Sequence, residues 1–207
     1  MDPLSCKESY MNVCGKYFGD EIRKILNGRE RKVVDHLPFP HAAVLLPLFE
    51  KEGECCILFT KRTHLVKHHK GEISFPGGMF DKEDADLERT ALREASEEIG
   101  LGEGDAQILG ALDDIVTVTE FIVTPFVGVV PYPYPFKLSP VEIAELIEVP
   151  LATLLDPSRF GEKEIIQNER KRMVEAYQYN DHNIWGATAR ILKQFLDLIS
   201  SPETIYP

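Results

Sequence analysis

The segment at residues 93–101 constrains this chain most, because its run Arg-Glu-Ala-Ser-Glu-Glu-Ile-Gly-Leu places three carboxylates in a helix-prone stretch. Glu94 and Glu98 are four residues apart, so a helix carries them one turn apart on one face, with Glu97 beside them. Like charges at this spacing destabilise an isolated helix by roughly 0.2–0.5 kcal/mol per pair. A divalent cation removes that cost, because hard cations take carboxylate oxygens as ligands. The sequence therefore predicts a metal-binding helix face that ends near Gly100.

The composition argues against two classes of protein, the binders of duplex nucleic acid and the membrane-spanning proteins. The 207 residues fit one large domain, and 43% hydrophobic residues are enough for a core. The net charge is −11, whereas a non-specific binder of duplex nucleic acid is expected to be basic, so we expect no nucleic-acid partner. The sequence has no run of 18 apolar residues, so we expect no membrane span. It begins without a secretory pattern and has no CxxC pair among its four cysteines, which predicts a reduced protein in the cytoplasm.

The pattern of apolar residues predicts a mixture of helices and strands. Helices with an apolar stripe are expected at residues 17–27, 86–99 and 187–199. Strands are expected at residues 42–49, 55–60, 72–75, 107–115 and 121–130, and a final hairpin at 171–179 and 182–185. Residues 143–149 fit a strand or a short helix, residues 151–155 fit a helical turn, and residues 76–78 are expected to break regular structure. Because helices and strands do not alternate strictly, we expect the α+β class or an α/β/α sandwich rather than a Rossmann fold.

Two features before and within the acidic helix suit phosphate chemistry. Gly77 and Gly78 precede the helix, and glycines there allow a tight turn and a close approach of a phosphate or a metal ion. Arg93 stands one residue before Glu94, and a guanidinium can hold a neighbouring carboxylate by two hydrogen bonds. We therefore expect Arg93 to fix one acid as an oriented ligand or base.

Residues 78–101 resemble the Nudix box, whose consensus is G-x5-E-x7-R-E-U-x-E-E-x-G-U with U an aliphatic residue. The matching positions are Gly78, Arg93, Glu94, Glu97, Glu98, Gly100 and Leu101. Asp84 replaces the first Glu and lies one residue further from Arg93, and Ala95 is small for its aliphatic position. Asp84 either caps the helix or has a metal-related role, and the sequence leaves both alternatives open.

Residues 58–78 resemble a second pattern, found in the Nudix enzymes that hydrolyse coenzyme A. That pattern is approximately L-L-T-x-R-[SA]-x3-R-x3-G-x3-F-P-G-G, and its spacing is kept here with Phe59, Thr63 and Lys67 as departures. The subfamily tolerates the Asp and the extra residue of the box, and its ending resembles residues 184–189. The resemblance covers about residues 42–199 and implies the Nudix fold, an α/β/α sandwich with a mixed central β-sheet.

The resemblance also implies a division of the chain and an activity. The Nudix hydrolase domain is expected at residues 41–200, after an N-terminal helix and connector at 1–40 and before a tail at 201–207. The implied reaction is a divalent-metal pyrophosphohydrolysis that cuts coenzyme A to 3′,5′-ADP and 4′-phosphopantetheine. The family also suggests a homodimer.

The resemblance assigns roles to the acids. Glu94 and Glu98 would bind Mg²⁺ or Mn²⁺, with Glu97 as a ligand directly or through water, and a metal-bound water is a better nucleophile because its pKa falls. The general base is Glu97 or Glu98, or an acid from a distant loop, for which Glu142 is preferred to Glu120. The predicted metal ligands are thus Glu94, Glu97 and Glu98, and the predicted catalytic residues are Arg93, Glu97, Glu98 and Glu142.

A basic cluster lies upstream of the box in an otherwise acidic chain. Its members are Lys61, Arg62, His64, Lys67, His68, His69 and Lys70. Such a patch would steer and hold the pyrophosphate and the 3′-phosphate of coenzyme A, although an ordinary exposed loop is the alternative. The predicted substrate-binding residues are Arg62, Lys67, Gly77 and Gly78.

Two other functions stay open from the sequence. The first is a Nudix hydrolase that acts on ADP-ribose or on a dinucleotide polyphosphate, since one fold hosts several activities. The second is a non-catalytic nucleotide sensor. A sensor would be expected to lose its metal ligands, whereas Glu94, Glu97 and Glu98 are all present.

Overall fold

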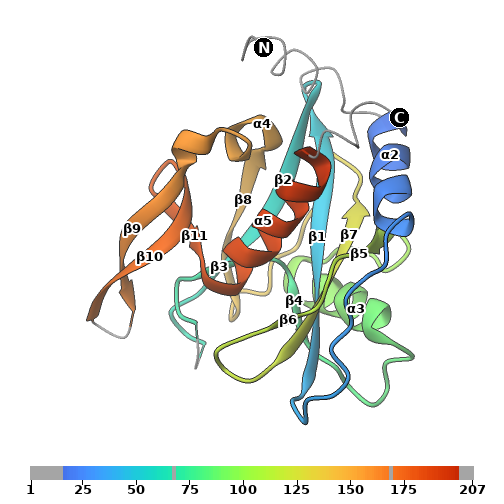
Figure 1. Cartoon of the computed structure of the whole chain (residues 1–207), viewed down its shortest axis with the longest axis horizontal. Helices are drawn as coiled ribbons and strands as arrows, with labels where there is room; N and C mark the ends of the chain where they lie inside the picture. The colour runs from blue at the N-terminus through green and yellow to red at the C-terminus, as the bar shows by residue number, and fades with distance from the viewer. Residues whose placement is uncertain (1–15, 67–68, 168–169, 201–207) are drawn as a thin grey trace.

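A mixed eight-stranded sheet forms the centre of the molecule (Figure 1). The structure is a computed structural model that describes residues 16–66, 69–167 and 170–200. The tail at 201–207, and Lys67 and His68 of the basic cluster, lie outside these ranges. The main path of the sheet runs through β3 (Ile73–Ser74), β2 (Glu54–Arg62), β1 (His41–Lys51), β7 (Ile122–Val129) and β5 (Gln107–Ala111). Three further strands pair at its sides: β4 (Gly77–Met79) with β1, β6 (Ile115–Val116) with β7, and β8 (Ile143–Pro150) with β2.

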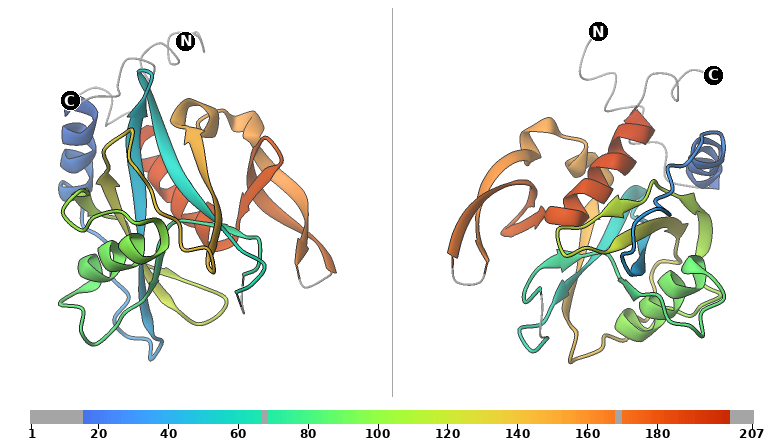
Figure 2. Two further views of the ribbon diagram at one scale, coloured as in Figure 1. Left: turned by 180° about the vertical axis from the view of Figure 1, so that it is seen from behind. Right: turned by 60° about the horizontal axis from the view of Figure 1, so that its bottom comes forward.

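Helices cover both faces of this sheet, as the two views of Figure 2 show. Helix α3 (Leu87–Ile99) packs on one face. Helices α5 (Gly186–Ser200) and α2 (Lys16–Asn27) pack on the other. Strands β1 and β7 are parallel, whereas the other strand pairs of the sheet are antiparallel. The predicted α/β/α sandwich with a mixed central sheet is therefore confirmed.

Strand β1 explains how one run of apolar residues serves both layers. Successive side chains of a strand point to opposite faces. Leu45 accordingly packs in the cluster under α3, whereas Leu46 packs in the cluster under α5. Both are fully buried, so β1 is a central strand with no solvent-facing side along most of its length.

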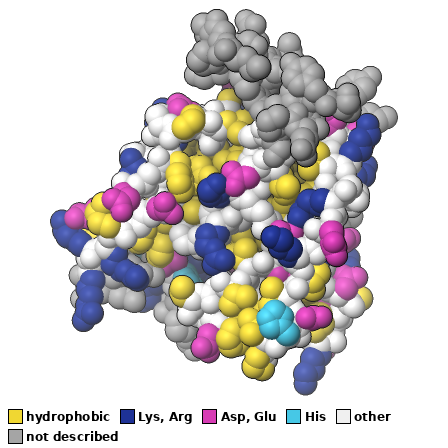
Figure 3. Space-filling model, in the orientation of Figure 1, with side chains coloured by type: hydrophobic (Ala, Val, Ile, Leu, Met, Phe, Trp, Pro, Cys, Tyr) yellow, Lys and Arg dark blue, Asp and Glu magenta, His cyan; other side chains and the backbone are white. Residues whose placement is uncertain are grey.

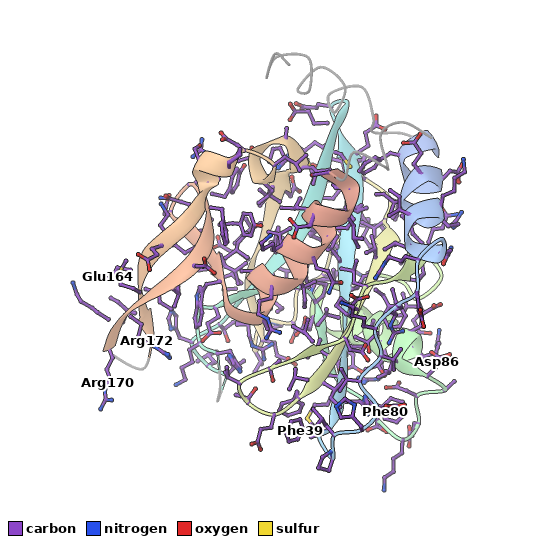
Figure 4. The ribbon with its side chains drawn as sticks, in the orientation of Figure 1. Phe39, Phe80, Asp86, Glu164, Arg170 and Arg172 are labelled. Atoms are coloured by element: carbon purple, nitrogen blue, oxygen red, sulfur yellow. The ribbon has the colours of Figure 1, made fainter. Side chains whose placement is uncertain are left out.

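A second, antiparallel sheet adjoins the sandwich. Its strands are β9 (Phe160–Gln167), β10 (Arg170–Tyr179) and β11 (His182–Trp185), in the order β11-β10-β9. Helix α4 (Leu151–Leu154) and the 3₁₀ turn η1 (Pro157–Arg159) lead into it from β8. Tyr177 and Ile184 join this sheet to the core under α5. Figure 4 shows Glu164, Arg170 and Arg172 on the hairpin of β9 and β10, across the molecule from Asp86 at the start of α3.

Most sequence-predicted elements are present, with three differences. Gly77 and Gly78 do not break regular structure: they form β4, whose register pairs Ala43 with Gly78. The strand expected at 107–115 is divided into β5 and β6. Strand β9 was not predicted. Of the two alternatives for residues 143–149, the strand is present. The domain boundary at residue 40 stays a prediction, although α2 contributes Ile22 to the core.

The face that carries α5 shows no large patch of side chains of one charge. Figure 3 shows acidic, basic and apolar side chains interspersed there. Within the described ranges, none of the helices is both long enough and apolar enough to cross a membrane.

Candidate active site on helix α3

Helix α3 is fixed at both ends, which sets the direction of its acids. Asp86 caps the N-terminus, because its carboxylate accepts a hydrogen bond of 2.9 Å from the amide of Arg89. Gly100 ends the helix with φ of 69°, a left-handed conformation that glycine adopts without strain. Ala91 and Ala95 face the sheet and are fully buried. The predicted helix and its stop at Gly100 are therefore present.

Arg93 is the centre of a hydrogen-bond network. Its Nε and Nη2 donate to the two carboxylate oxygens of Asp84 at 2.9 and 3.0 Å. Its Nη1 donates to Glu94 at 2.8 Å and to Glu97 at 3.3 Å. Nη2 also donates to the carbonyl oxygen of Met79 at 3.1 Å, which ties α3 to β4. Arg93 thus contacts two of the predicted metal ligands, but its two-point contact is with Asp84 rather than with the neighbouring Glu94.

Asp84 has a role that the sequence did not indicate. It does not cap α3, because Asp86 does. Its carboxylate accepts hydrogen bonds from Arg93, from the Thr90 hydroxyl at 2.8 Å and from the Asp81 amide at 3.1 Å. The hydrogen bonds from Arg93 hold the pKa of Asp84 well below its usual range. Asp84 is therefore a permanently charged anchor for Arg93.

Glu98 is buried on the side of α3 that faces β4. Its side chain is only 2% exposed. One carboxylate oxygen accepts the Gly77 amide and the other accepts Nη1 of Arg62, both at 3.2 Å. Burial raises the pKa of Glu98 to about 7, although Arg62 and the Gly77 amide act in the opposite direction.

Glu94 lies against the other glycine of β4. A Cβ on Gly78 would be 2.5 Å from Cδ of Glu94 and 2.6 Å from each of its oxygens, so only glycine leaves room for this carboxylate. Burial raises the pKa of Glu94, while its hydrogen bond from Arg93 acts in the opposite direction. The acids of two successive helical turns therefore lie against two successive residues of β4, and Glu97 is the exposed member of the set.

The structure brings one of the two distant acids to this site. Glu142 Oε2 is 3.9 Å from Nη2 of Arg62, and the Thr63 amide donates to the Glu142 carbonyl oxygen at 2.7 Å. The Ser139 amide donates to the carbonyl oxygen of Glu98 at 2.9 Å, so the loop before β8 is attached to α3. Glu120 is exposed in the turn between β6 and β7 and takes no part in these contacts.

The predicted basic cluster is partly neutralised by acids. Lys61 pairs with Glu145 at 2.7 Å, and Arg62 pairs with Glu98. His69 hydrogen-bonds Glu72 at 2.9 Å, which raises the pKa of His69. Among the described members of the cluster, Lys61, Arg62 and His69 are therefore paired with acids.

The three acids have the donor atoms that a divalent cation prefers, but their side chains are not arranged as a complete set of ligands. Glu94, Glu97 and Glu98 offer hard oxygen donors, which Mg²⁺ and Mn²⁺ prefer. In the part of the chain that the structure describes, no three His, Cys, Asp or Glu side chains are grouped so as to hold an ion. Arg93 and Arg62 instead supply the positive charge beside these carboxylates. A bound cation would neutralise these carboxylates in place of the two arginines.

Glu98 makes the metal-free protein less stable as the pH rises. Its pKa is about 7 in the folded state and 4.5 ordinarily, so between these values the folded state holds a proton that the unfolded state has lost. The contribution of Glu98 to the unfolding free energy therefore falls as the pH rises through this window, by about 3 kcal/mol. We expect the unfolding free energy, measured with urea in a chelator at pH 5 and pH 8, to fall about 2–3 kcal/mol less in Glu98→Gln than in the wild type. Identical pH dependence in the two proteins would contradict this.

Comparisons with known proteins agree on one family. A model of the NUDIX domain matches residues 39–168. A protein named "Uncharacterized Nudix hydrolase NudL" from Photorhabdus laumondii is 37% identical over 154 residues, which are 74% of this chain and 82% of that protein. The protein of the same name from Enterobacter sp. strain 638 is 37% identical over 153 residues, 74% of this chain and 79% of its own length. A MutT/nudix family protein structure from Enterococcus faecalis matches with a TM-score of 0.51 at 12% identity, over 96% of this chain and 75% of that one, which supports the fold alone.

Proposed function

The chain belongs to the Nudix family of hydrolases, which act on diphosphate bonds, and we propose that its substrates are coenzyme A and its derivatives. The proposed products are 3′,5′-ADP and 4′-phosphopantetheine. The observation that carries this proposal is that residues of both sequence patterns are in contact at Glu98. Arg62 and Gly77 of the upstream pattern, 36 and 21 residues away in the chain, both donate hydrogen bonds to this one carboxylate of the Nudix box. Residues of the pattern that resembles the coenzyme A branch therefore contact an acid that we propose as a metal ligand.

Nudix hydrolases generally use divalent cations, and we assign Glu94 and Glu98 as ligands of Mg²⁺ or Mn²⁺, with Glu97 assisting. The bound cation supplies charge neutralisation at the diphosphate and a more acidic water. Arg93 keeps the carboxylates of Glu94 and Glu97 oriented, and Gly78 leaves the space that Glu94 occupies. Gly77 holds Glu98 through its amide and lets β4 pass close to β1.

Glu142 is the proposed general base. Its side chain is 44% exposed, so it can reach a water molecule, and it lies beside Arg62. Glu98 is less suited to this task, because it is only 2% exposed, accepts the Gly77 amide and is assigned as a metal ligand. Glu97 is exposed but is bound by Arg93. Glu142 would take the proton of the attacking water, while Arg62 would donate hydrogen bonds to the diphosphate.

The substrate is tested by a comparison of three diphosphates. The purified protein is incubated with coenzyme A, dephospho-coenzyme A or ADP-ribose in Mg²⁺ or Mn²⁺, and the products are identified by mass. We expect coenzyme A to be cut about tenfold or more better than dephospho-coenzyme A in kcat/KM, because a charge-assisted hydrogen bond to the 3′-phosphate contributes about 1.5–3 kcal/mol.

Each other outcome of this assay has a defined meaning. Equal rates for the first two substrates would remove the recognition of the 3′-phosphate that is expected from the basic cluster. If ADP-ribose is cut best, the protein is an ADP-ribose hydrolase rather than a coenzyme A hydrolase. An inactive protein with all three would favour a nucleotide sensor.

A further inference from the structure

Arg62 occupies a position between two acids of the proposed site. Its Nη1 donates to the buried carboxylate of Glu98 at 3.2 Å, and its Nη2 is 3.9 Å from Glu142. The Arg62 side chain is 23% exposed and Glu98 is 2% exposed, so solvent screens this ion pair only weakly. We propose that Arg62 is an exchangeable counter-cation: it balances Glu98 in the free enzyme, competes there with the divalent cation, and moves to the diphosphate when substrate binds.

The strand geometry aims Arg62 specifically at Glu98. The register between β2 and β8 shifts between Lys61 and Arg62, and such irregularities redirect side chains next to active sites. The neighbouring Lys61 pairs with Glu145 instead. Two adjacent cations of equal charge thus have separate acidic partners, and only Arg62 contacts an acid of α3.

One atom of Arg62 has no partner among the residues that the structure describes. This atom is Nε, which is buried and has no hydrogen-bond acceptor there. A buried donor without an acceptor is unfavourable, so this guanidinium has hydrogen-bonding capacity that Glu98 and Glu142 do not use. A diphosphate offers several oxygen acceptors to a guanidinium fork. Arg62 would therefore gain hydrogen bonds if its guanidinium turned toward a diphosphate.

Backbone contacts of Thr63, the residue after Arg62, connect β2 to the loop that carries Glu142. The Thr63 hydroxyl donates to the carbonyl oxygen of Val141, and the Thr63 amide donates to that of Glu142. Val141 and Glu142 lie in the loop before β8, and the amide of Ser139 in that loop donates to the carbonyl oxygen of Glu98. Arg62 can therefore change partners while the backbone that carries the two acids stays connected.

Competition at Glu98 couples the binding of metal and substrate. Two cations beside one carboxylate repel each other, so Arg62 weakens the binding of the metal in the free enzyme. A substrate that draws Arg62 away relieves this repulsion, and by reciprocity the metal then strengthens the binding of the substrate. The inference rests on the proposed function, since it takes Glu98 as a metal ligand.

The test is the affinity for Mn²⁺ alone, with no substrate, measured by electron paramagnetic resonance of the free ion. We expect Arg62→Met to bind Mn²⁺ about 5- to 20-fold more tightly than the wild type, because one nearby positive charge is removed. Arg62→Lys keeps the charge and should stay within about twofold of the wild type. Lys61→Met is the matched control: it removes the same charge one residue away, and its affinity should also stay within about twofold.

The outcomes separate this inference from the proposed function. Unchanged or weaker Mn²⁺ binding in Arg62→Met overturns the exchange, and so does equal tightening in Lys61→Met. A wild-type protein that binds no Mn²⁺ overturns the metal assignment and the inference with it. Thermal melting in a chelator checks that each variant is folded, and Arg62→Gln replaces Arg62→Met if the latter does not fold.

Discussion

Glu98→Gln is expected to lower kcat/KM for the diphosphate substrate by roughly 10²–10⁴-fold. Glutamine has nearly the same shape as glutamate, so the buried position of residue 98 stays filled. It lacks the negative charge that holds a divalent cation and balances Arg62. The measurement is steady-state kinetics at saturating Mg²⁺ or Mn²⁺, with Glu88→Gln as the control, because Glu88 is exposed in the first turn of the same helix.

Stability distinguishes the loss of chemistry from a loss of fold. At pH 8 the wild-type protein carries a buried, ionised Glu98, whereas the glutamine variant does not. The metal-free variant should therefore be at least as stable as the wild type while its activity is lost. Added Mn²⁺ at 100 times its Kd should stabilise the wild type by about 2.7 kcal/mol and the variant by much less. Undiminished activity in Glu98→Gln would show that Glu98 is not a metal ligand.

The parts of this site that could be predicted from the sequence are those set by helical periodicity. Glu94 and Glu98 share a face because they are four residues apart, and Arg93 reaches Glu97 for the same reason. Gly100 ends the helix because glycine adopts the left-handed conformation there. These relations depend only on local spacing, so they hold before the tertiary fold is known.

The parts that were missed depend on contacts between distant segments. Asp84 contacts Arg93 because the loop at 80–86 folds back on α3, and no periodicity relates the two positions. Gly77 and Gly78 form a strand only because β1 lies beside them, since glycine itself disfavours strands. Strand β9 has the sequence FGEKEIIQ, in which charged residues interrupt any apolar alternation, so its pairing with β10 decides its structure. The partners of Arg62 depend on the same kind of long-range contact.

Gly78→Ala is expected to lower kcat/KM by about 10²-fold or more and to leave the fold nearly as stable as the wild type. The added methyl group would lie 2.5–2.6 Å from the carboxylate of Glu94, so this side chain must turn away from its position. Glu94 is a flexible side chain, and φ of Gly78 is not in the left-handed region, so the backbone itself tolerates alanine. The carboxylate would be displaced from the metal position while the helix and the strand remain. Kinetics and urea unfolding of the same sample measure the two effects.

Gly77→Ala should instead destabilise the fold strongly, and this difference in stability makes it the comparison for its neighbour. A Cβ on Gly77 would lie 2.4 Å from the carbonyl oxygen of Ala43 and 2.6 Å from Cα of Val44, and both atoms belong to the backbone of β1. The φ of Gly77 is 157°, which alanine rarely adopts, so the clash adds to backbone strain. Since β1 is the central strand, it cannot move without disturbing both cores, and we expect a loss of about 2–4 kcal/mol in unfolding free energy. If Gly78→Ala destabilises the protein as much as Gly77→Ala does, or keeps full activity, the displacement of Glu94 is not the reason that this position is glycine.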